Sequence, residues 1–283
     1  MKIALLICIL FAGFGVLKPS DLFSQQPEYE IFALKFGERT HKIPLSAIAV
    51  GATGTDSVQI NFMFWLLKGN NGKVILVDAG FTSDADINPM NITFSRPDSM
   101  LSKIHIKPED ITDIIITHPH WDHIGGIDLY PNAMVWMQKE DYEYFVGQAW
   151  QKEGNSGGFN KKDVTKIVQR NLDGKLKLVN GDDIEIIPGI RVYTGSKHTF
   201  QSQYVLTGNG EKSIIIASDN CWFYYNLEKL LPIPVTHDSK AYTKNLKRMK
   251  SMVKNTDFIL PGHDPQVFTK FLSVEEGVVL IKN

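Results

Sequence analysis

The chain has 283 residues, of which 43% are hydrophobic and 22% are charged. This is the composition of an ordinary globular protein, and it excludes disordered and fibrous classes. The 30 Lys and Arg residues nearly balance the 31 Asp and Glu residues, giving a net charge of -1. No broad cationic surface is therefore available to bind a nucleic acid or an anionic membrane. The 2 cysteines, Cys8 and Cys221, cannot build a disulfide framework.

The first part of the chain is typical of a secretory signal peptide. An apolar run covers residues 3–17, with a lysine before it and polar residues after it. The run is shorter than the roughly 20 residues of a membrane span and matches the apolar region of a signal peptide. We predict a signal peptide over residues 1–25, cleaved within residues 20–26, and a single mature domain over residues 26–283. A buried N-terminal strand or helix is the alternative.

Export follows from this prediction. The mature protein is expected in the periplasm or outside the cell, without a stable membrane anchor once the signal peptide is removed. Cys221 is then its one cysteine. Without a disulfide, the fold must depend on burial of its core, for which the chain is long enough.

The first half of the mature chain is mainly extended. Glycine and asparagine at residues 69–72 predict a hairpin turn between two strands. The polar, proline-containing stretch over residues 81–97 predicts a loop, followed by a short helix near residues 98–104. The predicted strands of this half cover residues 31–34, 60–67, 74–77, 111–117 and 133–137.

Helices and strands alternate in the second half. Helices are predicted over residues 139–150 and 161–171, with a loop over residues 154–160, and over residues 240–253. Strands are predicted over residues 176–179, 184–187, 190–193, 203–206, 213–217 and 258–260. Histidine and aspartate repeatedly follow the ends of strands, so we expect a site along one edge of a layered α/β domain.

Residues 118–123 read His-Pro-His-Trp-Asp-His. On an extended segment alternate side chains share one side, so His118 and His120 can bind one metal ion. Asp122 and His123, where the chain turns, can face a second ion. Imidazole and carboxylate groups are ligands that zinc and similar metals prefer. Loop histidines without a metal are the alternative.

The longer segment 117–126 resembles the motif of the metallo-β-lactamase-fold hydrolases, and the likeness extends over essentially the whole mature chain. Asp78 in Val-Asp-Ala-Gly, His198, Asp219 in Ser-Asp-Asn and His263 in Pro-Gly-His-Asp follow in the order expected for that family. The resemblance implies a four-layer αββα sandwich, which is an α/β fold with two sheets between layers of helices.

The resemblance also implies two bound metal ions. Zinc is expected from the ligand chemistry, with iron, manganese or cobalt as alternatives. The implied ligands are His118, His120 and His198 for one ion, Asp122, His123 and His263 for the other, and Asp219 for both. Asp78 is expected to lie beneath the metals and orient their ligands. The remaining histidines, His41, His105 and His237, are expected to face solvent.

Hydrolysis is the implied reaction. Two bound cations would make a hydroxide available near neutral pH and would polarise the oxygen of the substrate's carbonyl or phosphoryl group. Asp122 and Asp219 are therefore expected to be catalytic as well as metal-binding. Cys221 is expected to be a small packed side chain rather than a nucleophile.

Within the superfamily, the chain resembles the N-acyl homoserine lactonase-like branch. This likeness involves the hairpin around residues 64–81, Asp219, and residues 261–268. Asp219 also disfavours true metallo-β-lactamases, which lack a bridging aspartate there. The implied function is hydrolysis of a lactone or ester-like carbonyl, with N-acyl homoserine lactones as candidates. A thioesterase, a phosphodiesterase or a β-lactamase-like enzyme is the alternative, and a non-catalytic ligand-binding protein is another.

Two departures from that branch concern the substrate pocket. Characterised lactonases carry a tyrosine three residues after the bridging aspartate, where this chain has Trp222. Tyr224 is the candidate to replace that tyrosine. An aromatic mouth is predicted from Trp121, Phe200, Trp222, Phe223 and Tyr224, of which about half are expected to pack in the core instead. Such a mouth suits a small apolar or aromatic substrate. No pattern in the sequence indicates an oligomeric state.

Overall fold

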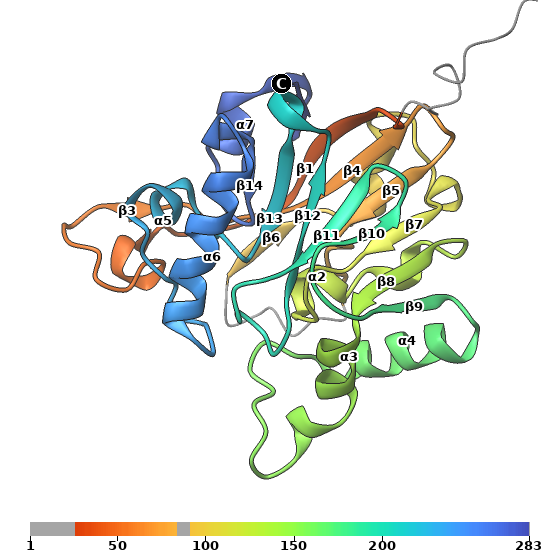
Figure 1. Ribbon diagram of the computed structural model, residues 1–283, viewed down its shortest axis with the longest axis horizontal. Coiled ribbons are helices and arrows are strands. Elements are labelled where there is room, and N and C mark those ends of the chain that lie inside the picture. Colours follow the sequence, from red (N-terminus) through yellow and green to blue (C-terminus); the bar gives the residue numbers. More distant parts are fainter. Residues whose placement is uncertain (1–25, 84–90, 283) are drawn as a thin grey trace, which may run out of the picture.

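Two β-sheets lie face to face at the centre of the molecule (Figure 1). The computed structural model describes residues 26–83 and 91–282. The predicted signal peptide over residues 1–25 lies outside the described residues. None of the helices in the described ranges combines the length and the hydropathy that a membrane span needs.

The first sheet has nine strands and is antiparallel on one side and parallel on the other. Its order is β15-β16-β1-β4-β5-β7-β8-β9, with β6 paired to β1. The strands are β1 (Tyr29–Arg39), β4 (Asn61–Gly69), β5 (Val74–Val77), β6 (Ile92–Phe94), β7 (Asp113–Ile115), β8 (Met134–Gln138), β9 (Leu176–Val179), β15 (Leu272–Glu275) and β16 (Val278–Ile281). The predicted hairpin is confirmed, because β4 and β5 pair antiparallel with Trp65 opposite Val77.

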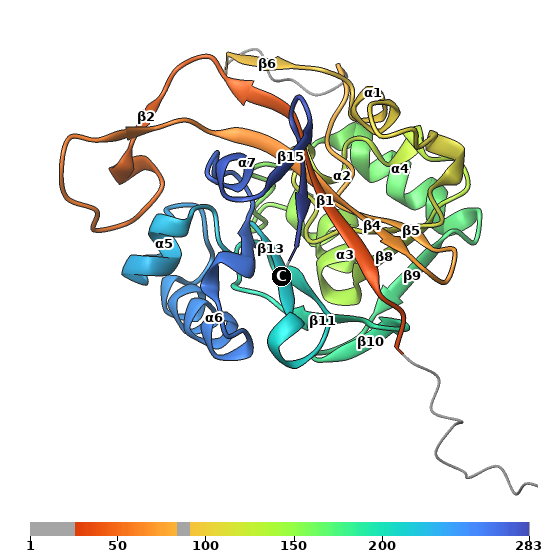
Figure 2. The ribbon, with the colours of Figure 1, turned by 90° about the horizontal axis from the view of Figure 1, so that it is seen from above.

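The second sheet has five strands in the order β10-β11-β12-β13-β14. They are β10 (Ile184–Ile187), β11 (Ile190–Thr194), β12 (Gln203–Thr207), β13 (Ile214–Ser218) and β14 (Ile259–Pro261). All neighbours pair antiparallel except β13 and β14, which are parallel. A separate pair of short strands, β2 (Ile43–Pro44) and β3 (Ser57–Val58), projects from one side (Figure 2).

Helices cover the outer face of each sheet, which confirms the predicted αββα order (Figure 2). The first sheet is covered by α1 (Pro97–Ser102), α3 (Lys139–Val146) and α4 (Lys161–Leu172), and the second by α6 (Ser239–Met252). Trp65 and Ile216 are buried between the sheets. Phe145 on α3 and Ile167 on α4 belong to the core that covers the first sheet, and Leu246 on α6 belongs to the core that covers the second. Full burial of each such apolar side chain contributes about 1.5–3 kcal/mol.

Side-chain caps fix where the two longest helices begin. Asn160 accepts a hydrogen bond from the backbone N–H of Lys162 at the start of α4. Asp238 accepts two such bonds, from Lys240 and Ala241, at the start of α6. Each cap contributes about 1 kcal/mol by satisfying N–H groups that the helix leaves free. Both helices lie within one or two residues of their predicted bounds.

Several elements differ from the prediction. The helix predicted over residues 139–150 ends at Val146, because Gly147 leaves the helical region with φ -129° and ψ -88°. The predicted loop over residues 81–97 contains β6. The elements that were not predicted include β2, β3, β15, β16 and three short helices, which are α2 (Trp121–Ile124), α5 (Tyr224–Lys229) and α7 (Val267–Lys270).

Arg170 on α4 donates hydrogen bonds to the segment that follows the histidine motif. Its buried guanidinium donates to the carbonyl oxygens of Ile127 at 2.6 Å and Tyr130 at 2.9 Å. Replacing Arg170 by methionine removes both charge-assisted hydrogen bonds and leaves these carbonyls only the longer bonds from the backbone N–H groups of Tyr130 and Ala133. A hydrogen bond to a charged group contributes about 1.5–3 kcal/mol. We expect the free energy of unfolding, measured by urea denaturation and circular dichroism, to fall by about 2–4 kcal/mol.

Arg191→Met is the matched control. This half-exposed arginine lies on β11 and bonds Asp183 at the surface, so its loss should cost less than about 1 kcal/mol. If the Arg170→Met protein were no less stable than the Arg191→Met protein, the proposed role of these hydrogen bonds would be wrong.

Candidate metal centre

Seven buried side chains gather at one edge of the two sheets, beyond the ends of the strands. The seven residues are His118, His120, Asp122, His123, His198, Asp219 and His263. The first four follow β7 or lie on α2, and the last three follow β11, β13 and β14 respectively. The structure therefore brings together all the residues that the resemblance implied as metal ligands.

The first group consists of His118, His120, His198 and Asp219. Nδ1 of His120 lies 3.1 Å from Nε2 of His118 and 3.0 Å from Nε2 of His198. Oδ2 of Asp219 lies 3.7 Å from Nε2 of His118 and 3.1 Å from Nε2 of His198. These four atoms converge on one point, as the ligands of a tetrahedral ion do.

Asp122, His123 and His263 form the second group. Oδ2 of Asp122 lies 3.3 Å from Nε2 of His123 and 3.7 Å from Nε2 of His263. Oδ1 of Asp219 lies 3.4 Å from Nε2 of His123 and 3.1 Å from Nε2 of His263. Asp219 therefore presents one carboxylate oxygen to each group.

Each group draws its members from both sheets. In the first group, His118 and His120 belong to the first sheet, whereas His198 and Asp219 belong to the second. In the second group, His263 is the member that comes from the second sheet. The centre thus lies where the strand ends of the two sheets meet.

The polar atoms of these side chains that lack a hydrogen-bond partner fit two bound cations. Nε2 of His123 and Oδ1 of Asp219 are buried without a hydrogen-bond partner. Leaving such atoms unsatisfied costs about 1–3 kcal/mol each, which a cation bound between them removes. Three imidazoles with one carboxylate, and two carboxylates with two imidazoles, are both ligand sets that suit zinc and related divalent metals.

Asp78 orients the ring of His123. Its buried carboxylate accepts hydrogen bonds from Nδ1 of His123 at 2.8 Å, from the hydroxyl of Ser218 at 2.8 Å and from the backbone N–H of Thr117 at 2.8 Å. A carboxylate only accepts, so Nδ1 of His123 carries the proton. In the neutral ring the lone pair is then on Nε2, which faces Asp122 and Asp219.

The outer nitrogens of two further ligands are fixed by backbone carbonyls. Nδ1 of His198 donates to the carbonyl of Val235 at 2.6 Å, and Nδ1 of His263 donates to that of Asn61 at 2.8 Å. In both rings Nε2 is therefore the unprotonated nitrogen, and it points into the centre. Such second partners commonly set the tautomer of metal-binding histidines.

Burial and mutual repulsion keep two of the histidines neutral. Burial, followed by the neighbouring imidazoles, lowers the pKa of His118 well below its ordinary value. Burial and His198 lower the pKa of His120 to about 3. Neutral imidazole is the form that binds metals, so these rings are ready to bind over a wide pH range.

The second group is more negative. Burial opposes charge on His123, but the carboxylates of Asp122, Asp219 and Asp78 raise its pKa above the ordinary value. Burial likewise opposes charge on Asp219, and the adjacent His263 and His123 hold its pKa well below the usual range. The carboxylates of Asp122 and Asp219, whose pKa values are both lowered, therefore stay ionised and attract cations.

Left-handed backbone conformations occur next to the centre. Asp78 has φ 63°, Lys197 has φ 59° and Ser218 has φ 48°. Residues other than glycine rarely adopt such angles, which cost of order 1–3 kcal/mol each. The strained residues either contribute to the Asp78 hydrogen bonds or directly precede His198 and Asp219. The backbone strain therefore lies next to the residues that position the metal ligands.

The loop before α4 forms a wall of the first group. Gly158 has φ 79°, and a Cβ added there would lie 2.6 Å from Cδ2 of His120. The carbonyl of Gly158 accepts from the backbone N–H of Trp121 at 2.9 Å. The ring of Phe159 lies 5.5 Å from that of His120. Glycine is thus required at position 158, because its φ is positive and because a side chain there would clash with His120.

The predicted aromatic mouth is only partly present. The half-buried ring of Trp222 lies 6.0 Å from that of His198, whereas the half-buried ring of Trp121 packs on Phe62 and Phe81. Phe200 is 38% exposed and stacks on Tyr144 at 4.6 Å. The prediction for Phe223 is wrong, because its side chain is 2% exposed and belongs to the core beneath the first sheet.

The prediction for Tyr224 is also wrong. Its hydroxyl donates to the carbonyl oxygen of Asp257 at 2.9 Å, and burial raises the pKa of this phenol above its ordinary value. Asp257 precedes β14, whereas His263 follows that strand. The hydroxyl is therefore held at the opposite end of β14 from the ligands and cannot replace the lactonase tyrosine.

The remaining histidines and the cysteine behave as expected. His41, His105 and His237 are exposed. Cys221 is buried in the core of the second sheet, and burial raises the pKa of its thiol above the ordinary value. A thiol in this state is a poor nucleophile.

Asn220 and Asp141 position ligands, although no such role was predicted for either residue. The carbonyl oxygen of the buried Asn220 side chain accepts from the backbone N–H of Ser196 at 2.8 Å and from the hydroxyl of Ser202 at 2.9 Å. Asp141, on α3, accepts from the hydroxyl of Thr199 at 2.7 Å. Both side chains hold the loop that carries His198.

Asp141 should make stability depend on pH. Burial raises its pKa to about 6, whereas the unfolded chain has a value of about 3.9. The contribution of Asp141 to the free energy of unfolding is therefore fully present below its pKa in the unfolded chain, and it is lost as the pH rises through about 6. We expect the unfolding free energy of the wild type, relative to Asp141→Asn, to fall by about 2 kcal/mol between about pH 4 and about pH 7.

Urea denaturation of both proteins in the presence of a chelator measures this difference, because metal release then contributes to neither. A difference that stays flat or rises over the same range would contradict the raised pKa of Asp141.

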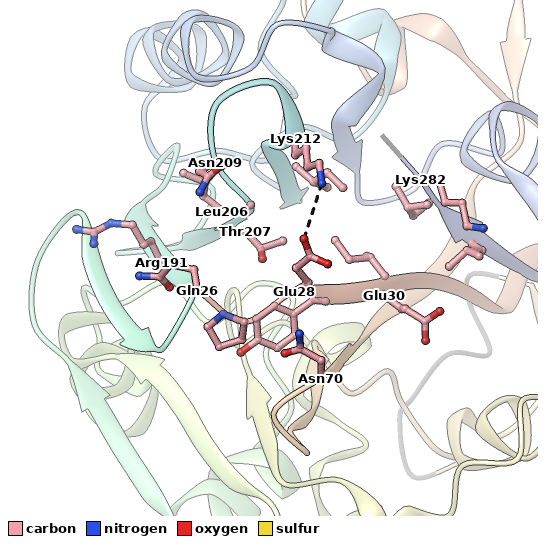
Figure 3. Close-up of a pocket in the computed structure, with 18 of the residues that line it drawn as sticks. Gln26, Glu28, Glu30, Asn70, Arg191, Leu206, Thr207, Asn209, Lys212 and Lys282 are labelled. Carbon is pink, nitrogen blue, oxygen red and sulfur yellow. Dashed lines mark ion pairs between the residues drawn. The ribbon is translucent and has the colours of Figure 1, made fainter. Parts of the chain in front are cut away.

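A cavity of about 800 Å³ lies at the opposite edge of the sheets (Figure 3). Asn70, in the turn before β5, lines it, whereas Asp78 follows the other end of that strand. An ion pair of 3.8 Å between Glu28 and Lys212 lies within it (Figure 3). None of the seven clustered residues lines this cavity, so it is separate from the candidate metal centre.

Residues 63–263 match the family model of the metallo-beta-lactamase superfamily. This span runs from β4 to the last clustered histidine and covers most of the chain. The chain therefore belongs to the metallo-beta-lactamase superfamily. Within it, the chain is a metal-dependent hydrolase related to lactonases, with two groups of histidine and aspartate residues that can hold two metal ions.

Its similarity to named proteins is distant but covers most of each chain. An N-acyl homoserine lactonase of Bacillus cereus is 25% identical over 238 residues, which are 78% of this chain and 88% of the relative. A crystal structure of a quorum-quenching N-acyl homoserine lactone lactonase has a TM-score of 0.69 at 21% identity, covering 90% of this chain and 99% of the other.

A third comparison concerns a hydrolase with a ligand. The structure of an N-acyl homoserine lactone hydrolase with the product N-hexanoyl-L-homoserine at its catalytic metal centre has a TM-score of 0.69 at 20% identity. It covers 88% of this chain and 98% of the other. At this identity the structures establish the shared fold.

Proposed function

We propose that this chain is an exported dizinc hydrolase that opens a lactone or cleaves an ester-like carbonyl of a small apolar molecule. N-acyl homoserine lactones are the first candidates, since relatives along most of the chain are named as their lactonases. The proposal depends mainly on one observation, which is that the carboxylate of Asp219 presents one oxygen to each of two ligand groups.

Two divalent cations bound side by side lower the pKa of a shared water and polarise a substrate oxygen. The chain would hold one cation with His118, His120 and His198 and the other with Asp122, His123 and His263. Asp219 would be a ligand of both cations, because its carboxylate presents one oxygen to each group. Asp122 adds negative charge to the second group, which favours retention of a cation there.

The surroundings favour an apolar substrate. The half-buried ring of Trp222 lies beside His198 and His263, and the ring of Phe62 lies 5.4 Å from that of His263. The exposed ring of Phe200 lies on the loop that carries His198. Val235, which is 50% exposed, accepts a hydrogen bond from His198. Apolar surface next to a cluster of polar groups is typical of small-molecule sites.

A substrate panel tests this proposal. The mature protein, loaded with zinc, is offered an N-acyl homoserine lactone, an aryl ester, a thioester, a phosphodiester and a β-lactam, and acid release is followed in a pH-stat. We expect turnover of the lactone, the ester or both. Turnover of the phosphodiester, the thioester or the β-lactam with none of the lactone or the ester would overturn the substrate assignment.

The metal is tested separately. Elemental analysis of protein purified without added metal should give two zinc equivalents per chain, and removal by a chelator should abolish activity that zinc restores. A protein holding well under one equivalent of any divalent metal, and inactive after zinc addition, would contradict the dizinc assignment.

Export is tested by cell fractionation. We expect the mature protein in the periplasm or the medium, with an N-terminus within residues 20–26 by Edman sequencing. Full-length protein found only in the cytoplasm would contradict the predicted signal peptide.

A further inference from the structure

The indole of Trp222 donates a hydrogen bond to Asp219, the residue that faces both ligand groups. Nε1 of Trp222 lies 2.7 Å from Oδ2 of Asp219. Within the part of the chain that the structure describes, no other non-histidine side chain donates a hydrogen bond to this carboxylate. The contacted oxygen is the one that lies 3.1 Å from Nε2 of His198.

The position of Trp222 is fixed from three sides. Its ring lies edge-on to His198 at 6.0 Å and to His263 at 5.7 Å, so it touches one histidine of each group. Its backbone carbonyl accepts from the N–H of His263 at 3.1 Å. The buried hydroxyl of Tyr242 donates to the carbonyl of Asp219 at 3.0 Å and accepts from the N–H of Trp222 at 3.2 Å.

A carboxylate attached by a single bond can rotate, and rotation of Asp219 would remove one oxygen from each group. The donor on Oδ2 opposes this rotation, since turning the carboxylate breaks a charge-assisted hydrogen bond. The indole N–H has no other acceptor to serve, and the fixed backbone of residues 219–222 aims it at this oxygen. Outer partners of metal ligands commonly orient them in this way.

We propose that Trp222 is a positioning residue of the metal centre, which holds the Asp219 carboxylate so that each oxygen faces one ligand group. The inference rests on the dimetal assignment made above. It predicts that the N–H of residue 222, rather than its ring alone, sets the affinity of the centre for metal.

Zinc binding by the full mature protein tests the inference without any substrate. Metal-free wild type and the variants Trp222→Phe and Trp222→Gln are titrated with zinc against a competing chelator, which yields the two binding constants. Phenylalanine keeps an aromatic ring and loses the donor. Glutamine loses the ring but carries an N–H at the same number of bonds from Cα. Circular dichroism confirms that each variant is folded.

Trp136→Phe is the matched control. Nε1 of Trp136 donates to Oδ1 of the buried Asp113 at 2.9 Å, which is the same kind of pair between β8 and β7 and includes none of the seven clustered residues. This variant loses an indole and a hydrogen bond to aspartate without touching the metal centre. It should therefore keep both zinc constants of the wild type.

We expect at least one zinc constant to fall about ten- to a hundredfold in Trp222→Phe, and Trp222→Gln to recover most of that loss. Wild-type constants in Trp222→Phe would overturn the inference. Equal losses in both variants would also overturn it, since the ring rather than the donor would then matter. If Trp222→Phe does not fold, wild-type constants in Trp222→Gln support the inference and reduced ones overturn it. A wild type that binds no zinc would instead contradict the proposed function.

Discussion

Replacing Asp219 by alanine should lower kcat/KM for the substrate that the panel identifies by about a thousandfold or more. The reason is that one side chain presents an oxygen to both ligand groups, so its loss weakens both cation positions at once. Stabilisation of charge by bound cations accounts for several kcal/mol of the barrier to hydrolysis, and each 1.36 kcal/mol is about tenfold in rate. Steady-state kinetics and zinc content, measured on the same preparation, check the result.

Asp182→Ala is the control for Asp219→Ala. Asp182 is an exposed aspartate that pairs with Arg248 on α6 and lies outside both ligand groups. It should retain wild-type kinetics and zinc content. If Asp219→Ala kept two zinc equivalents and a kcat/KM within about tenfold of the wild type, the shared role of this carboxylate would be refuted.

Asp78→Ala is expected to lower both stability and metal affinity. The buried carboxylate accepts from His123, Ser218 and Thr117, and alanine leaves these donors unpaired. We expect the free energy of unfolding of the metal-free protein to fall by about 3 kcal/mol or more. We also expect zinc affinity to fall about ten- to a hundredfold, since His123 loses the partner that fixes its tautomer.

Asp113→Ala separates the two effects of Asp78→Ala. Asp113 is likewise a buried aspartate, and it bonds Lys73 and Trp136 away from the centre. Its removal should lower stability and leave zinc affinity at the wild-type value. Equal zinc affinities in the Asp78 and Asp113 variants would show that Asp78 acts on stability alone.

Much of the fold could be predicted because its strands carry strong local patterns. The run Ile-Asn-Phe-Met-Phe-Trp-Leu-Leu and the turn after it are sufficient to define β4 and the hairpin. β16 was not predicted, although its four apolar residues match in number those of β5, whose assignment depended on the hairpin turn before it. A short apolar run alone does not distinguish a strand from a buried helix. The place of β16 beside β1, with Ile31 opposite Ile281, depends on contacts between the two ends of the chain.

The metal ligands could be predicted because residue type and order along the chain carry the signal. His198 and Asp219 lie far apart in the sequence, and their order after the histidine motif identified them together. The errors concern side-chain direction. Phe223 and Tyr224 follow Asp219 closely, but Phe223 is the first residue before α5 and turns into the core, while the Tyr224 hydroxyl reaches Asp257. Sequence spacing does not determine such directions.

Because each ligand group contains residues from both sheets, a bound cation links the two sheets. Binding to the folded form alone adds RT ln(1 + [M]/Kd) to the free energy of unfolding, which is about 2.7 kcal/mol at a metal concentration a hundredfold above Kd. The melting temperature should therefore rise with free zinc. In a compartment poor in this metal, newly folded chains would open and be degraded more readily, so the amount of this protein would follow the supply of zinc as well as its synthesis.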